Sequence, residues 1–389
     1  MATSAALRQI NQARILNTLR KGSWSRVALA EELGLNRSTV TVIVSGLLEQ
    51  GLVRELDAAP SGAKANGRPR VGVALQGGGA YFGGLELGNE LLTAVVTDLT
   101  GREVGRASEP TRPEKGPQNA EERLCELLAG VVGDRRLEGI GLTIPGIVTP
   151  AARLEWAPTL DWRNVTLGET ARTRFDVAVY VENDANAAAL AEEQLREASE
   201  GDNLLFVQLD SGVGAGLLVD RQLYRGGAGR VGESGHIRLP AADGSTGAEV
   251  EEVIGRQAIL RAYRSEADHD ATWEDLLAAV EAGEPTAEHL RDSWQATLGW
   301  LTAALAWTLD PDVIVFGGPA SALLQSDTTA LHRSLRNNGP AGITNVWRLS
   351  SLGPQGAALG AVALSQRAFF AIPPLLQPGN SRTNLEVAS

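Results

Sequence analysis

The sequence contains a single cysteine, Cys125, among 389 residues, and this scarcity excludes several kinds of protein. One thiol cannot form a disulfide within the chain, nor can it supply a zinc site built from several thiolates. No apolar run approaches the length of a membrane span, and the amino terminus lacks the apolar segment of a signal peptide. We therefore expect a soluble protein of the reducing cytoplasm that makes no contact with membranes.

Charge is distributed unevenly along the chain. Residues 1–75 hold ten Lys and Arg against five Asp and Glu, a net charge of +5, whereas the remainder carries −17, which gives the overall −12. With 43% hydrophobic residues and 44 glycines, the chain is long enough for two or three domains. A basic head on an acidic body indicates that only the head meets a polyanion such as DNA.

Apolar spacing in the basic head predicts three short helices. The stripe from Leu7 to Leu19 belongs to the first helix, Ser25 can cap the second, and Gly34 lies just after its end. Asn36 or Ser38 then opens a third helix with its own buried stripe. Three short helices with a glycine turn between the second and the third predict a helix-turn-helix.

The exposed face of the predicted third helix is rich in hydroxyl groups. Side chains near the amino end of such a helix reach base edges in the major groove of DNA. We predict DNA contacts from the start of the second helix and from the third helix: Ser25, Arg37, Ser38, Thr39 and Thr41. The alternative for this face is a small helical domain that binds another protein.

A polar loop, residues 57–66, separates two short predicted strands, the second from Val71 to Leu75. Two strands around such a loop form the wing of a winged helix-turn-helix. Arg68, beside Pro69, is a candidate for insertion into the minor groove, where a narrow width concentrates negative potential. Its alternative role is that of a solvated linker residue.

The acidic body is organised around one junction between a strand and a helix. A β-branched run at 177–181 predicts the strand, and the alanine-rich run after it predicts a helix that begins near Asn183. Ligands of open α/β sheets bind outside the carboxyl ends of strands, so Asn183 and Asp184 could face a small polar molecule there. Either residue could instead cap the helix. The alternation of strands and helices along the body predicts an α/β fold with mixed sheets.

Several motifs of the body occur together in one family. They are the run from Val181 to Glu192, the glycine loop Gly212 to Gly216, the stretch Gly232-Glu233-Ser234-Gly235-His236 and the run from Asp310 to Gly318. In this order and spacing they resemble the ROK family (repressor, open reading frame, kinase), and the head, with Gly67-Arg68-Pro69, resembles that of its repressor branch. The resemblance implies a winged helix-turn-helix at 1–75, a two-lobed, actin-like and sugar-kinase-like body at 80–369, and a loose tail at 370–389.

The resemblance also implies a sugar site. By family position, the hydroxyl groups of a sugar would be bound by Asn183, Asp184, Glu233, His236 and Glu251. Carboxylates accept hydroxyl protons, whereas an amide and an imidazole both donate and accept. Asp184 corresponds to the catalytic base of the kinase members. The choice of Glu251 is open, because Glu249 and Glu252 lie close to it in the sequence.

Two departures from the family pattern decide the predicted function. Kinase members carry an Asp-x-Gly-x-Thr loop for ATP phosphates, but this chain has Glu86-Leu87-Gly88-Asn89-Glu90, and two carboxylates there would repel a nucleotide. The family usually binds zinc through the motif histidine and three cysteines of the next loop, but residues 241–249 contain no cysteine. We therefore expect no phosphoryl transfer, no metal and no cofactor.

The sequence thus predicts a transcriptional regulator, with repression as the expected sign, that binds a DNA operator and responds to a sugar effector. A homodimer or homotetramer would match an operator with two half-sites. Two alternatives stand beside this prediction. One is a sugar kinase that has kept a DNA-binding head, and the other is a regulator that has lost its sugar and responds to a partner protein.

Overall fold

The computed structural model describes residues 4–56, 71–196, 198–240, 246–267, 269–353 and 356–372. The chain forms two compact units. Unit 1 comprises residues 1–82, 97–104 and 366–389, and unit 2 comprises residues 83–96 and 105–365. Most of the tail expected after residue 370 lies outside the described residues. No helix in the described part is long and apolar enough to cross a membrane.

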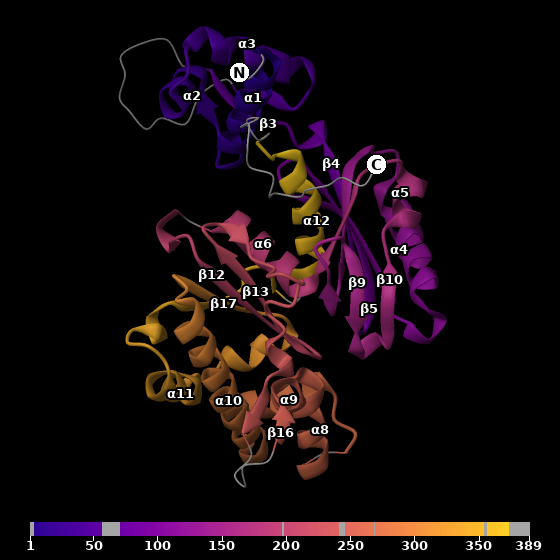
Figure 1. Cartoon of the computed structure of the whole chain (residues 1–389), viewed down its shortest axis with the longest axis vertical. Helices are drawn as coiled ribbons and strands as arrows, with labels where there is room; N and C mark the ends of the chain where they lie inside the picture. Colours follow the sequence, from indigo (N-terminus) through magenta and orange to yellow (C-terminus); the bar gives the residue numbers. More distant parts are fainter. Residues whose placement is uncertain are drawn as a thin grey trace. The chain divides into compact units, whose positions relative to one another are not determined.

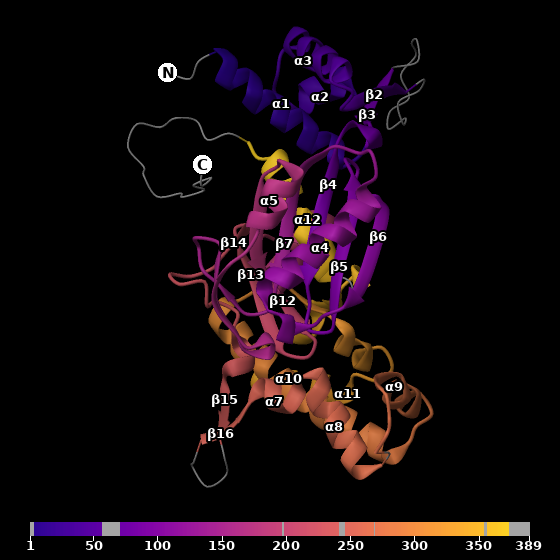
Figure 2. The same cartoon turned by 90° about the vertical axis from the view of Figure 1, so that its right-hand side faces the viewer.

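Unit 1 begins with a winged helix-turn-helix, as the sequence predicts (Figures 1 and 2). Its helices are α1 (Ser4–Arg20), α2 (Arg26–Leu33) and α3 (Arg37–Glu49). Its sheet has the strand order β1-β3-β2, formed by β1 (Trp24–Ser25), β2 (Val53–Leu56) and β3 (Gly72–Leu75). The wing loop between β2 and β3 falls almost entirely outside the described residues.

The helices of this head pack through the predicted apolar stripes. Leu16 of α1, Leu29 of α2 and Val44 of α3 are all buried. Gly34 ends α2 in the left-handed conformation, with φ of 62°, and its N–H reaches the carbonyl oxygens at the end of the helix. A residue with a Cβ is strained there, so this glycine sets the tight turn into α3.

Unit 2 contains most of a five-stranded sheet with the order β11-β7-β4-β5-β6. The strands are β4 (Tyr81–Leu87), β5 (Leu91–Asp98), β6 (Glu103–Pro110), β7 (Leu137–Ile144) and β11 (Val179–Asn183). A small antiparallel sheet accompanies it, formed by β8 (Ile147–Val148), β9 (Arg153–Ala157) and β10 (Trp162–Thr166).

Helices cover both faces of the five-stranded sheet. They are α4 (Pro117–Val132), α5 (Glu169–Phe175) and α12 (Gly356–Phe369). A Cβ added to Gly83 would meet Leu128 of α4, whereas one added to Gly84 would meet Val362 of α12. Because neighbouring strand residues point to opposite faces, α4 and α12 lie on opposite sides of β4 (Figure 1). Cys125 is buried in α4, where we expect a core residue.

A second five-stranded sheet has the order β14-β13-β12-β17-β18. Its strands are β12 (Leu204–Leu209), β13 (Val213–Val219), β14 (Gln222–Leu223), β17 (Val313–Gly317) and β18 (Trp347–Leu349). Helix α6 (Asp184–Leu195) packs on this sheet through its alanines, which share a core with Phe206 and Val315 (Figure 1). This helix therefore joins the carboxyl end of β11 to the second sheet.

The remaining helices cover the other side of the second sheet. They are α7 (Val250–Ile254), α8 (Arg256–Glu266), α9 (Trp273–Glu281), α10 (Pro285–Leu309) and α11 (Thr329–Asn338), with the hairpin β15 (Arg238–Pro240) and β16 (Thr246–Glu249) before them. Short 3₁₀ helices are η1 (Gly77–Gly79), η2 (Pro113–Lys115), η3 (Pro158–Leu160), η4 (Ala198–Glu200), η5 (Ser234–His236), η6 (Pro319–Leu324) and η7 (Ile343–Asn345).

The expected glycine loop from Gly212 to Gly216 is mostly a strand. Residues from Val213 onward belong to β13, so Gly214 and Gly216 lie within the sheet. A Cβ added to Gly216 would lie 2.5 Å from the carbonyl oxygen of Ala185. The first turn of α6 therefore requires glycine here for close packing, which is a structural role and needs no phosphate.

Candidate functional site

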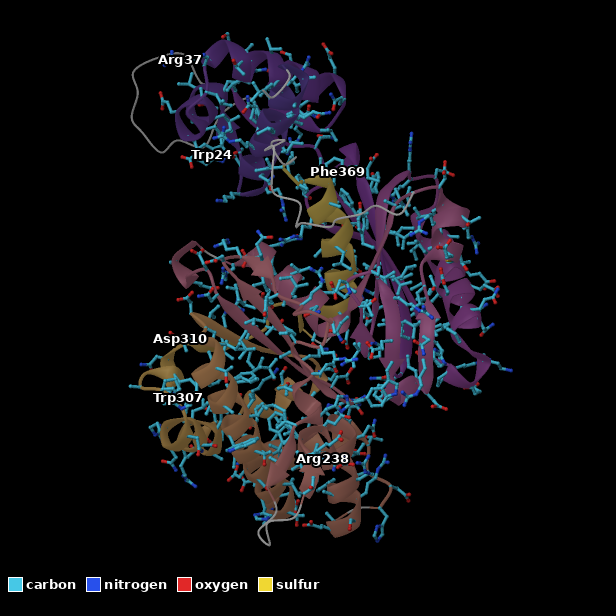
Figure 3. All side chains as sticks on the ribbon, in the orientation of Figure 1. Trp24, Arg37, Arg238, Trp307, Asp310 and Phe369 are labelled. Atoms are coloured by element: carbon cyan, nitrogen blue, oxygen red, sulfur yellow. The ribbon has the colours of Figure 1, made fainter. Side chains whose placement is uncertain are left out.

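The predicted DNA contacts on α3 lie on one solvent-facing side of that helix. Arg37, Ser38 and Thr41 are exposed, and Thr39 is half-buried. The Arg37 side chain is 74% exposed, and its ion pair with Glu31 is long at 3.9 Å. Figure 3 shows Arg37 at the outer edge of the head. Four of the predicted residues are therefore brought together on a surface that a groove of DNA could meet.

The other two predicted DNA contacts differ from these four. Ser25 is buried, and its hydroxyl accepts a hydrogen bond of 3.1 Å from the N–H of Ala28. Its side chain thus caps α2, which leaves little of it for DNA. Arg68 lies outside the described residues.

All five predicted sugar-binding residues line one cleft of unit 2. The cleft holds about 560 Å³ of space, part of it open to solvent. Its polar lining consists of Asn89, Thr159, Asn183, Asp184, Gln208, Asp210, Glu233, His236 and Glu251. The side chains come from both sheets and from η5 and α7, so this site exists only once the two sheets are assembled.

The junction between β11 and α6 is held by a network around Glu182. This buried carboxylate accepts hydrogen bonds from the N–H of Asn183 and the side chain of Asn186, and it pairs with Arg225 at 2.6 Å. The side-chain oxygen of Asn183 caps α6 by accepting a hydrogen bond from the N–H of Asn186. Its side-chain amide donates a hydrogen bond of 3.0 Å to the carbonyl oxygen of Gly146. The capping alternative is therefore right for Asn183, which also lines the cleft.

Asp184 is the first residue of α6 and faces the cleft. One carboxylate oxygen accepts a hydrogen bond of 2.9 Å from the N–H of Ala185. Burial raises the pKa of Asp184 to about 7, helped by the charges of Asp210 and Glu233 and opposed by the Ala185 hydrogen bond. A carboxyl with this pKa exchanges a proton near neutrality, so it can accept or donate a hydrogen bond to a ligand.

Two further carboxyl groups lie near Asp184. Burial, together with the charges of Asp184 and Asp210, raises the pKa of Glu86 to about 8. Asp210, at the end of β12, pairs with Arg256 at 3.3 Å, and Arg256 also pairs with Glu90. The region where kinase members would hold phosphates is therefore acidic.

The opposite wall of the cleft is built around His236. Its Nδ1 lies 2.9 Å from Glu249 and 3.6 Å from Glu251, and its Nε2 lies 3.9 Å from Glu233. Burial lowers the pKa of His236, but the Glu249 hydrogen bond and the neighbouring carboxylates raise it by more, so the net shift is upward. Trp156 stacks on the imidazole with ring centres 5.5 Å apart, which fixes its orientation.

The three glutamates considered for this wall have separate places. Glu251 lines the cleft. Glu249 bonds to His236 and pairs with Arg238 at 2.9 Å, and Glu252 accepts from the N–H of Glu249 in a capping box of α7. Among these carboxylates, Glu251 is therefore the one positioned to touch a ligand.

A metal is implied here by the family resemblance, but the donors differ from its pattern. His236, Glu249 and Glu251 each have a ligand atom within 4.8 Å of one another. Glu249 is already neutralised by Arg238 and by the imidazole, and Cys125 lies in α4, away from this wall. These residues do not fit a site built on three thiolates. We describe them as a hydrogen-bonded cluster.

Sequence reasoning missed Thr159, Gln208 and Asp210 as lining residues. Thr159 donates a hydrogen bond of 2.5 Å to Asn89. Gln208 and Asp210 are polar residues at the carboxyl end of the apolar run Leu204 to Leu209. That position was a usable signal, because the carboxyl ends of strands are where such sheets bind ligands.

Comparison with known proteins agrees with this geometry. Residues 82–368 match the ROK family. The chain is 28% identical over 245 residues to the xylose repressor of Bacillus subtilis, a match that covers 61% of this chain and 63% of that repressor. It is 26% identical over 386 residues to the DNA-binding transcriptional dual regulator NagC of Escherichia coli, and this match covers 94% of each chain.

Two solved structures share the fold. One is a ROK family transcriptional regulator described as a homolog of the E. coli MLC protein, with a TM-score of 0.72, 24% identity and coverage of 94% of this chain and 97% of that one. The other is a ROK family glucokinase from Streptomyces griseus in complex with glucose and AMPPNP, with a TM-score of 0.65 and 23% identity. The match to the glucokinase covers 74% of this chain and 100% of the glucokinase chain.

Proposed function

Because this chain belongs to the ROK family, we propose that it is a DNA-binding transcriptional regulator, a repressor of sugar-metabolism genes whose operator affinity is controlled by a sugar. One observation carries the proposal. A winged helix-turn-helix with a polar, exposed α3 face precedes, in the same chain, a cleft in which all five predicted sugar-binding residues meet.

The proposed DNA contacts come from α3. Arg37 would bind phosphate or a guanine edge, and Ser38, Thr39 and Thr41 would contact base edges at short range. Arg68 of the wing is proposed for the minor groove. Ser25 would act through the cap of α2, which positions the following helix.

The proposed sugar contacts come from both walls of the cleft. Asp184 and Glu233 would accept from sugar hydroxyls, and Asn183, His236 and Glu251 would complete the hydrogen-bonding pattern. A sugar that leaves any of these buried groups unpaired would bind less well, which provides selectivity. Bound sugar would alter operator affinity by its different affinity for two conformations of the regulator.

We propose that the chain is not a kinase. Glu86 and Asp210 would place carboxyl groups beside a triphosphate, and the glycines that resembled a phosphate loop instead pack against α6. Phosphoryl transfer depends on positioned donors and cations around the phosphates, whereas carboxylates beside the phosphates repel their negative oxygens. Asp184 alone supports the kinase alternative, because its pKa of about 7 suits a general base.

The regulator is proposed to act as a homodimer or homotetramer in the cytoplasm. Two copies of the head would match an operator with two half-sites related by a two-fold axis. Sedimentation of the purified protein with and without an operator duplex would measure the number of copies bound.

The proposal is tested in two steps with the full chain. An operator is first selected from a library of random duplexes, and thermal unfolding is measured with a panel of monosaccharides, aminosugars and ATP. A sugar at a hundred times its dissociation constant should add about 2.7 kcal/mol of stability. The same sugar should change operator affinity, and both effects should vanish in Asp184→Ala.

Asp220 offers a matched control for the carboxylate change, because this exposed residue lies outside the cleft. Asp220→Asn should keep sugar binding and DNA binding. Stabilisation by ATP, with turnover lost in Asp184→Asn, would establish the kinase instead. Stabilisation by no sugar would leave the regulator controlled by a partner protein.

A further inference from the structure

The lining of the cleft carries more negative than positive groups. Asp184, Asp210, Glu233 and Glu251 all line it, and among the described lining residues there is no lysine or arginine. Among the described lining residues, His236 is the one that could carry a positive charge, and it already faces Glu233, Glu249 and Glu251. The positive charge of a protonated His236 is therefore already paired with these three glutamates.

The cations behind the lining do not restore the balance. Arg256 is shared between Asp210 and Glu90. Arg106 lowers the pKa of Glu86, but burial and the charges of Asp184 and Asp210 outweigh it. Burial likewise raises the pKa of Asp210, Glu233 and Glu251. For each of these carboxyl groups, burial therefore outweighs the nearby positive charge, and a further cation in the cleft would favour the ionised forms.

A second observation concerns Gln208, which is only 7% exposed to solvent. Its Oε1 is buried and has no hydrogen-bond partner among the described residues, although the residue lines the cleft. Leaving a buried acceptor unpaired is costly, so such groups call for an explanation, and a ligand that donates a hydrogen bond is one.

The strand register places Gln208 close to Asp184. Gln208 pairs with Gly214 of β13, and a Cβ added to Gly214 would lie 3.3 Å from the Cβ of Ala185, which follows Asp184. Asp210 lies two residues after Gln208, and its charge acts on Asp184. Three acceptors, namely two carboxylates and an amide oxygen, therefore lie near one another in the lining of the cleft.

We propose that the cleft takes an amino sugar in its ammonium form, with the –NH₃⁺ group seated between Asp184, Asp210 and Gln208. This inference rests on the proposed function of the cleft as a sugar site. An ammonium group has three donors and no acceptor, which matches these three acceptors. Hydrogen bonds between ionised partners are about twice as strong as neutral ones.

The same charges select against related sugars. A phosphate or carboxylate substituent would be repelled by the carboxylates and would find no arginine or lysine in the described lining. N-acetylation removes the positive charge and two of the three donors. A neutral parent sugar keeps its hydroxyl donors but leaves the excess negative charge unpaired, so its affinity should be lower.

Calorimetry on the full chain tests this with matched pairs: glucose and glucosamine, galactose and galactosamine, mannose and mannosamine. N-acetylglucosamine and glucosamine 6-phosphate complete the panel. At pH 7, the amino sugar of the best-binding pair should bind at least about tenfold more tightly than its parent, the ratio expected from a charged rather than a neutral hydrogen bond. Its acetylated and phosphorylated forms should bind more weakly still.

Two variants test whether the ammonium group binds at the proposed position. Gln208→Met keeps the length of the side chain and removes the acceptor, and Asp210→Asn removes one charge. Each should reduce the ratio of amino-sugar to parent affinity severalfold while parent binding persists, and Asp220→Asn should leave the ratio unchanged. Thermal unfolding confirms that each variant is folded.

The outcomes separate this inference from the function on which it rests. A parent, acetylated or phosphorylated sugar that binds as tightly as the amine would overturn the inference and leave the sugar sensor standing. If no sugar binds, both the amino-sugar inference and the proposed sugar-sensing function are wrong. An amine preference that survives in folded Gln208→Met and Asp210→Asn would show that the ammonium group sits elsewhere.

Discussion

The side-chain amide of Asn17 donates a hydrogen bond of 2.8 Å to the carbonyl oxygen of Phe370, 353 residues further along the chain. Asn17 belongs to α1 of the head, and Phe370 directly follows α12. The guanidinium of Arg20 also lies 4.6 Å from the centre of the Phe370 ring. These three residues all belong to unit 1, so within this unit α1 is held against the residue that follows α12.

Phe370→Ala should therefore destabilise the head. Phe370 is buried and packs edge-on against Phe369, so its truncation should cost about 3–5 kcal/mol. Asn17→Ala should cost less, about 1 kcal/mol. Hydrogen exchange of the α1 amides should speed up in both variants. Ile372→Ala, at a 52% exposed residue, is the control, and equal effects in all three would contradict this role of the contact.

Arg37→Ala should weaken operator binding by about 1–3 kcal/mol. The salt slope, which is the slope of the logarithm of the binding constant against the logarithm of the salt concentration, should fall in magnitude by about 1. The reason is that Arg37 is exposed and held only by a distant Glu31. Arg26 is the matched control, since it is tied to Glu55 at 2.7 Å. Arg26→Ala should change the slope less. Both salt slopes are measured by fluorescence anisotropy between low and high salt. Equal slopes for the two variants would show that Arg37 does not contact DNA.

Arg68→Ala should also weaken operator binding, by one to a few kcal/mol, if this side chain enters the minor groove. The loss should be greatest for operators whose flanks have a narrow minor groove, because that is where negative potential is concentrated. The measurement is competition between operators that differ only in these flanks. Unchanged affinity would return Arg68 to the linker role.

Stability should fall as pH rises from about 5 to 8. Burial raises the pKa of Glu86 from 4.5 to about 8 and that of Asp184 from 3.8 to about 7. The folded chain then binds more protons than the unfolded chain in this window, so raising the pH favours unfolding. His236, with its raised pKa, acts in the same direction.

Glu86→Gln isolates this effect, because glutamine keeps the shape and cannot ionise. The variant should melt at a higher temperature than the wild type at pH 8, and the difference should shrink at pH 5.5. Glu138→Gln, at an exposed position of β7, is the control. A gap between Glu86→Gln and the wild type that is the same at both pH values would show that the Glu86 carboxyl is not responsible.

Gly360→Ala should disturb the contact between α12 and α6. A Cβ at Gly360 would lie 2.5 Å from the carbonyl carbon of Ala187, so the helices must separate, at a cost of about 1–3 kcal/mol. Since α6 begins at Asp184, sugar affinity should fall as well. Gly130→Ala in α4 meets no atom within 4 Å and should stabilise by about 0.5–1 kcal/mol. Destabilisation by both would point to a general intolerance of alanine.

Local order along the chain could be predicted from the sequence. The apolar stripes of the head gave α1, α2 and α3, because helical spacing and the left-handed Gly34 act within a few residues. The junction from β11 to α6 and the cap at Asn183 were predictable for the same reason. Separate motifs such as Gly232 to His236 could be assigned to one family, and so to one fold.

Only the tertiary structure decided what surrounds each of these residues. Position 216 of β13 requires glycine because α6 crosses the strand at close range, which no local pattern reveals. Gln208, Asp210 and Thr159 line the cleft together with Asp184 because the carboxyl end of β12 and the 3₁₀ helix η3, which are far apart in the sequence, both border it. The pKa of Asp184 likewise depends on burial and on charges brought from elsewhere in the chain. Sequence sets residue chemistry and local conformation, whereas burial and electrostatic environment arise from packing between distant segments.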